Sequence, residues 1–184
     1  MSLQSKVNMK DLLAHGLYLL IQQKPFEKIT IKQICDKTGV IRGTFYNHFM
    51  DKYECLEYLC GQIIMEENTQ HLENNDLHSF IAHSLETIAE HKEFYYKGFQ
   101  IEGQNNFGEM LQKIYKRAIL RCLINKQIDL KDSLITLNQL SSYHASTLIL
   151  MIKNWVENGC KESSDQVMKM IDYFYSNSLY DFLD

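Results

Sequence analysis

Proline is almost absent from this chain of 184 residues, which contains one proline and eight glycines. Disordered chains and turn-dense all-β chains need many more of both residues. Hydrophobic residues make up 45% of the sequence, and strand patterns are scarce. The composition therefore predicts a compact, mainly α-helical protein.

Paired cysteine motifs and long apolar runs are also missing. The five cysteines are an odd number, and none of them forms a Cys-x-x-Cys pair, which is typical of reduced thiols in a cytosolic protein. No apolar stretch approaches transmembrane length, and the polar N-terminus lacks the apolar run of a signal peptide. We therefore expect a soluble, cytoplasmic protein without membrane contact.

Motifs of catalysis and metal binding are absent as well. The chain has no Gly-x-Ser-x-Gly elbow and no glycine-rich phosphate loop, so we expect neither enzyme activity nor a cofactor. The histidines between His71 and His144 never pair four residues apart on one helical face, and no thiol stands at ligand spacing. We expect no metal site, and an all-helical metal-binding protein remains a distant alternative.

Charge is unevenly distributed along the chain, whose net charge is -4. Residues 1–60 carry eight Lys and Arg against six Asp and Glu, a net charge of +2, whereas residues 61–184 carry eleven against seventeen, a net charge of -6. A slightly basic head on an acidic body fits a protein that contacts phosphates with one end only. An excess of two charges also arises by chance.

Helical periodicity organises the N-terminal part. Apolar residues spaced by three and four predict a helix over Lys6–Gln23, which Pro25 ends. Thr30 and Gln33 form the pattern of a capping box for a short helix to about Lys37, and Gly39 supplies the left-handed residue that ends it. A second short helix is expected over residues 41–48, and a long one begins at Asp51.

The remainder of the chain predicts an all-α body. After a polar stretch at Glu66–Asp76, five helical segments are expected: Leu77–Glu90, Glu93–Gln100, Phe107–Lys126, Ser133–Asn158 and Ser164–Phe182. We therefore divide the chain into a three-helix head over residues 1–52 and a helical bundle over residues 53–184 that binds ligand and dimerises.

Two short helices joined by a glycine turn and flanked by longer helices have the layout of a helix-turn-helix. At 100° per residue, one side of the second short helix should pack inward; it holds Ile41, Phe45 and Phe49. The other side should face outward with groups suited to phosphates and base edges. It holds Arg42 on its shoulder and Gly43, Thr44, Tyr46 and Asn47.

The run from Thr30 to Lys52 resembles the DNA-binding motif of the TetR family of regulators. It has the threonine cap, the helix, the Gly39 turn, the segment Thr44-Phe-Tyr-Asn-His-Phe49 and the lysine of that motif. The resemblance covers about residues 6–60, whereas the rest of the chain matches only in helical layout and length. The Trp155–Gly159 segment is also similar to the end of the family's penultimate helix.

The resemblance implies particular roles for these side chains. Phosphate contacts fall to Thr30, Tyr46, His48 and Lys52, and base or backbone contacts to Arg42, Thr44 and Asn47. Capping by Thr30, packing by His48 and plain solvation of Tyr46 and Lys52 are the alternatives. Ile41 departs from the family pattern, which has a serine or small polar cap there, and losing a cap costs about 1 kcal/mol.

Aromatic residues are frequent in the body and admit two interpretations. They either pack in the core or line a pocket for a small effector. The candidates for a pocket are Tyr95, Phe99, Tyr115, Tyr143 and Trp155.

The favoured hypothesis is a ligand-responsive repressor of the TetR type. Two copies paired through the last two helices would present two recognition helices to a pseudo-palindromic double-stranded DNA operator. An unknown small molecule would shift the heads, with the helix from Asp51 as the lever. The alternative is a coactivator of the same family that acts through another regulator protein.

Overall fold

The computed structural model describes residues 8–65, 68–103, 106–131 and 133–183, and every regular element in these ranges is helical. The N-terminal helices are α1 (Met9–Ile21), α2 (Ile31–Thr38), α3 (Arg42–Tyr46) and α4 (Lys52–Met65), with a 3-10 turn η1 (Phe26–Lys28) after α1. The C-terminal helices are α5 (Thr69–Glu73), α6 (Leu77–Glu90), α7 (Lys92–Phe99), α8 (Phe107–Asn125), α9 (Leu137–Glu157) and α10 (Ser164–Ser176), followed by the 3-10 turn η2 (Leu179–Phe182). The predicted all-α fold class is confirmed.

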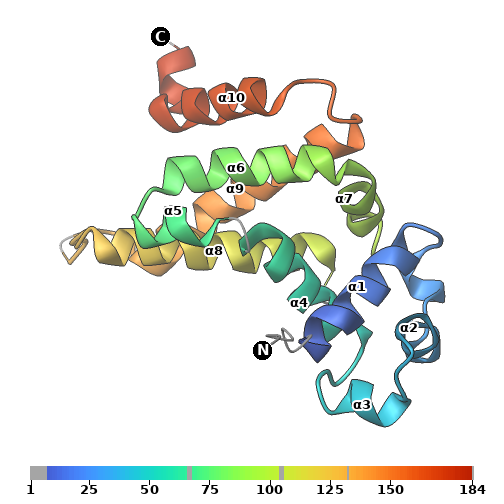
Figure 1. The fold of residues 1–184 in the computed structure, drawn as a ribbon. Helices are drawn as coiled ribbons and strands as arrows, with labels where there is room; N and C mark the ends of the chain where they lie inside the picture. The colour runs from blue at the N-terminus through green and yellow to red at the C-terminus, as the bar shows by residue number, and fades with distance from the viewer. Residues whose placement is uncertain (1–7, 66–67, 104–105, 132, 184) are drawn as a thin grey trace, which may run out of the picture.

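The head consists of α1, α2 and α3 packed against the start of α4, at the lower right of Figure 1. Its local signals act as the sequence predicts. The Gln33 amide donates to the Thr30 hydroxyl at 3.3 Å, and the Gln33 side chain accepts from the Thr30 amide at 3.0 Å, which completes the capping box. Gly39 ends α2 in the left-handed region with φ of 72°.

The body begins within α4, which packs on α1 in the head and on α8 in the body. Asp51 caps α4 by accepting from the amides of Tyr53 and Glu54 at 2.8 and 2.9 Å. The helices α8 and α9 pack against each other, and α10 lies alongside α6 at the far end from the head (Figure 1). This arrangement makes α4 the element common to both parts.

Several helix boundaries differ from the predicted ones. The first helix begins at Met9 behind an Asn8 cap, and the predicted positions 6 and 7 lie outside the described residues. The polar stretch after α4 contains the short helix α5, which has no sequence signal beyond Leu72, its one buried residue. The helix expected from Ser133 starts at Leu137, because Thr136 and Gln139 form its capping box. The last α-helix ends at Ser176, before η2.

The interior is continuous from head to body. The buried apolar residues form one cluster that includes Leu13 and Phe45 in the head, Leu56 and Cys60 in α4, and Phe107 in α8. Among the described residues, no helix is both long and apolar enough to cross a bilayer.

Candidate nucleic-acid interface

The helix α3 has five residues and is held in place by tertiary contacts, because a helix this short is unstable alone. Phe45 is completely buried and Phe49 is 2% exposed, as predicted from the helical pattern. Their ring centres lie 5.8 Å apart, and Phe49 lies 5.5 Å from the ring of Tyr58 on α4. The aromatic anchor therefore fixes one side of α3 against the head and leaves the other side to solvent.

The solvent side of α3 carries most of the side chains predicted to contact DNA. Arg42, Gly43 and Asn47 are exposed, and Tyr46 is 56% exposed. Thr44 and His48 are half-buried at the margin. The exposed groups include a guanidinium, an amide and a phenol within one and a half turns, which are the donors and acceptors that phosphates and base edges require.

Ile41 does not pack inward, and the prediction that it shares the buried side with Phe45 is wrong. Its side chain is 76% exposed, and it precedes α3 with extended backbone and without a side-chain cap. Helical periodicity fails here because Ile41 is the N-cap residue, whose backbone is not helical. The structure therefore agrees with the sequence that α3 has no side-chain cap.

Lys52 is turned toward the protein and not toward solvent. Its ammonium group donates to the backbone oxygens of Phe26, Glu27 and Ile29 at 2.8, 3.2 and 3.0 Å. Burial lowers the pKa of Lys52, and the nearby Glu27 carboxylate acts in the opposite direction. The alternative of a plainly solvated lysine is corrected: Lys52 ties α4 to the turn before α2. Sequence spacing alone carries no signal for these long-range contacts. The predicted phosphate contact of Lys52 stays a prediction.

Two polar contacts join α1 to the segment around α7, and sequence reasoning missed both. The Tyr18 hydroxyl on α1 lies 3.0 Å from Nδ1 of His91, at the junction of α6 and α7. The Lys97 ammonium on α7 donates to the backbone oxygen of Gln22, at the end of α1. A basic side chain at a helix C-terminus stabilises the unpaired carbonyls there. The segment around α7 thus holds the end of α1.

The predicted pocket residues do not converge on one hollow. Tyr95 and Tyr115 are fully buried, and Phe99 and Trp155 are 8% and 5% exposed. The indole of Trp155 donates to the Glu162 carbonyl at 3.0 Å, between α9 and α10. Tyr143 is 64% exposed on α9, which corrects its assignment to an enclosed pocket in one chain. A helical stripe does not reveal which side of α9 faces the core.

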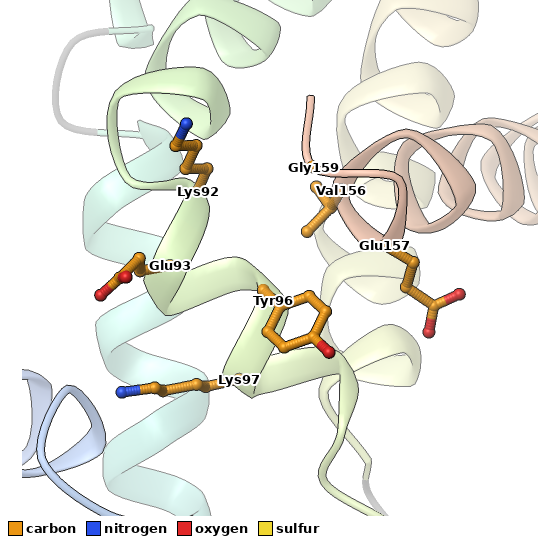
Figure 2. A pocket seen from close by; sticks show the side chains of 7 residues that line it. All are labelled: Lys92, Glu93, Tyr96, Lys97, Val156, Glu157 and Gly159. Carbon is orange, nitrogen blue, oxygen red and sulfur yellow. The ribbon is translucent and has the colours of Figure 1, made fainter. Parts of the chain in front are cut away.

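The surface hollows among the described residues include three that lie elsewhere, and none of these three is lined by the five predicted pocket residues. One of about 340 Å³ lies between α7 and the end of α9, where the Tyr96 ring points toward Val156 and Glu157 (Figure 2). Another, of about 400 Å³, is lined by Tyr18 and His91 with residues of α1 and α4. Within the described part of the chain, no three His, Cys, Asp or Glu side chains form a group suited to a metal ion.

Comparison with known families decides the identity of this fold. Residues 18–59 match the family described as "Bacterial regulatory proteins, tetR family". Residues 75–177, more than half of the chain, match the one described as "Transcriptional regulator C-terminal region". The chain belongs to the TetR family of transcriptional regulators. As a TetR-family regulator it has a DNA-binding helix-turn-helix head and a helical C-terminal domain.

Solved structures of other regulators share the fold at low sequence identity. The dihydroxyacetone kinase operon activator DhaS is 18% identical with a TM-score of 0.66, over 91% of this chain and 94% of that one. The fatty acid degradation regulator FadR from Bacillus halodurans is 17% identical with a TM-score of 0.61, over 96% and 98%. FadR from Thermus thermophilus, a repressor solved with lauroyl-CoA, is 15% identical with a TM-score of 0.60, over 88% and 90%. No curated protein sequence matches the chain.

Proposed function

We propose that this TetR-family protein is a ligand-responsive repressor that binds a pseudo-palindromic operator as a homodimer. The observation that carries the proposal is the division of α3 into a buried aromatic side and an exposed polar side. A short helix anchored in this way enters the major groove without unfolding its own core. Tyr46 and His48 are assigned to phosphates, and Arg42, Thr44 and Asn47 to base edges.

Thr30 is assigned to a phosphate in addition to its capping role. Its side chain is exposed at the start of α2, after the turn η1. A helix start offers unpaired amides and a favourable dipole to an anion. Lys52 acts as a positioning residue, because its ammonium group is already bonded to three carbonyls.

The homodimer is proposed to form through α9 and α10. Large apolar side chains remain exposed on these helices and on η2, and contiguous exposed apolar surface marks association sites. They are Tyr143, Leu150, Met170, Tyr173, Phe174, Tyr175, Leu179 and Tyr180. Tyr143, excluded from an enclosed pocket, fits this surface. A twofold pair of heads then fits two successive major-groove half-sites.

The effector is proposed to enter the body near Tyr95 and Tyr115. The Tyr95 phenol oxygen is buried without a hydrogen-bond partner among the described residues, whereas the Tyr115 hydroxyl has the Ser84 side chain beside it as a hydrogen-bonding neighbour. A buried hydroxyl without a partner is costly, and a ligand that accepts or donates there removes that cost. Tyr95 belongs to α7, the helix that also holds the end of α1 through Lys97. A ligand that displaces Tyr95 would therefore also displace the end of α1 in the head.

A titration of selected duplex DNA tests this proposal. The wild type is first used to select duplexes from a random pool, and we expect it to retain some of them. Tyr46→Phe should lower the affinity for every selected duplex by about three- to tenfold, because it loses one hydrogen bond. Thr44→Ala and Asn47→Ala change sequence preference instead, since they act on base edges. Tyr96→Phe, at a 48% exposed tyrosine of the body, is the control. Retention of no duplex contradicts the proposal.

A second candidate function is activation of transcription through another regulator protein. The observation that favours it is the pair of exposed apolar side chains on the head, Ile41 at 76% and Met50 at 80%. DhaS, which shares the fold, is described as an operon activator. Binding of the isolated protein to DNA favours the first candidate, whereas binding only in the presence of a partner protein favours the second.

A further inference from the structure

We propose that Ile41 is a specificity-determining residue that contacts the C5-methyl group of a thymine in the operator. The inference rests on the proposed function, in which α3 occupies the major groove. It assigns a role to the residue at which this chain departs from the family pattern. The contact is apolar and is therefore distinct from the polar contacts of Arg42, Thr44 and Asn47.

The placement of Ile41 supports this role. Its side chain is 76% exposed, although a branched aliphatic group is among those most often buried. Its Cδ1 lies 4.0 Å from the position that a Cβ would take on Gly43. The aliphatic side chain thus lies beside Gly43 on the outer side of the first turn of α3. Because Gly43 has no side chain, nothing from this position stands between Ile41 and a duplex.

Neither folding nor capping accounts for an isoleucine at this position. The side chain forms no cap, and the buried core cluster does not include it. A serine there would cap α3 and stabilise the helix. An exposed isoleucine gains energy only when a partner covers it, and the apolar group that bases present in the major groove is the thymine methyl.

The expected size of the effect follows from one buried methyl group. Covering such a group contributes ~0.8 kcal/mol, which corresponds to about a fourfold change in affinity. Replacing the contacted thymine by deoxyuridine removes the methyl and leaves the hydrogen-bonding groups of the base unchanged. The wild type should therefore lose about fourfold in affinity at that base in each half-site.

The experiment measures binding of wild type, Ile41→Val and Ile41→Ser to a duplex selected by the wild type. Each thymine is replaced by deoxyuridine in turn. We expect the wild type to discriminate about fourfold at one position per half-site, Ile41→Val less, and Ile41→Ser not at all. Thermal denaturation of Ile41→Ser should show a folded head at least as stable as that of the wild type, because serine restores a cap.

Two results overturn the inference, and they are distinguishable. If deoxyuridine changes the affinity of the wild type and of Ile41→Ser equally at every position, Ile41 contacts no thymine methyl group. The proposed DNA-binding function is then unaffected. If no duplex is selected at all, the proposed function fails and this inference fails with it.

Discussion

The ammonium group of Lys52 lies 2.8 Å from the backbone oxygen of Phe26 and 4.4 Å from the centre of the Phe26 ring. This pair joins the first residue of α4 to the turn between α1 and α2. The ammonium group gains both a cation–π contact with the ring and hydrogen bonds to carbonyl oxygens, and both are stronger at a partly buried site. The orientation of α4, which belongs to head and body, is thereby coupled to the head.

We predict that Lys52→Met lowers the free energy of unfolding by about 1–3 kcal/mol, because three carbonyls lose their donor. Lys28→Met, at an exposed lysine of the same turn, should change it by less than about 0.5 kcal/mol. Denaturant titration measures both. If Lys52 instead binds a phosphate, the variant keeps its stability and the salt dependence of DNA binding falls by about 0.9 in slope.

Close packing of α1 on α2 gives a second prediction. A Cβ on Gly16 would lie 2.3 Å from Cγ2 of Thr38, whose hydroxyl is fixed by donation to the Ile34 carbonyl at 2.8 Å. Gly16→Ala should therefore lower stability by about 1–3 kcal/mol, the usual cost of overpacking. Gly61→Ala in α4, with no atom within 4 Å of the added Cβ, should raise it by up to about 1 kcal/mol. Equal melting temperatures for the two variants would contradict this packing.

A substitution at Gly43 should affect DNA binding without lowering the stability of the fold. An added Cβ meets only Ile41 Cδ1 at 4.0 Å, which is an ordinary contact, so Gly43→Ala should fold with unchanged or slightly higher stability. The same methyl group extends the outer side of α3, and we expect at least about a tenfold loss of DNA affinity if the duplex approaches that side closely. Thermal denaturation and DNA titration of the same preparation measure both quantities. Undiminished affinity would show that DNA does not approach Gly43.

The buried hydroxyl of Tyr95 gives a prediction about stability. It has no hydrogen-bond partner among the described residues, and burial raises the pKa of Tyr95 well above its usual value. Tyr95→Phe removes a polar group whose burial is uncompensated and should raise the free energy of unfolding by roughly 1 kcal/mol. Tyr18→Phe, which removes the group bonded to His91, should lower it instead. A destabilised Tyr95→Phe variant would mean that this hydroxyl is paired in solution.

His144 on α9 should make stability depend on pH. Burial lowers the pKa of His144, and the edge of its ring meets Tyr175 of α10 at 4.9 Å between centres. The histidine therefore binds a proton more readily in the unfolded chain than in the folded one. The free energy of unfolding is highest above about pH 6.5 and falls as the pH drops below that value. His144→Phe should weaken that decline, whereas His15→Phe, at an exposed position, should leave it unchanged. Melting temperatures of the wild type and His144→Phe that fall equally with decreasing pH would contradict the assignment.

The sequence predicts the elements best where signals are local. The capping box of Thr30 and Gln33, the left-handed Gly39 and the buried pair Phe45 and Phe49 all depend on neighbours within a few residues, and all are confirmed. The helix α5 was not predicted, because a five-residue helix with one buried side chain has no periodicity to detect.

The side chains of the candidate site are predicted less completely. The contacts of Lys52 with Phe26 and of Tyr18 with His91 join residues 26 and 73 positions apart, and spacing along the chain does not encode them. The exposure of Tyr143 follows from tertiary orientation, which helical periodicity leaves open, and that of Ile41 follows from the non-helical backbone of an N-cap residue. The predicted DNA contacts remain predictions until binding is measured.

Footprinting of a duplex selected from a random pool tests the central claim most directly. If two copies of α3 lie in successive major grooves, the wild type protects two related segments whose centres are about 10 base pairs apart or a multiple of that distance. Tyr46→Phe should weaken the protection of both segments equally. Protection of one segment without twofold symmetry, or protection that Tyr46→Phe leaves intact, would contradict the account.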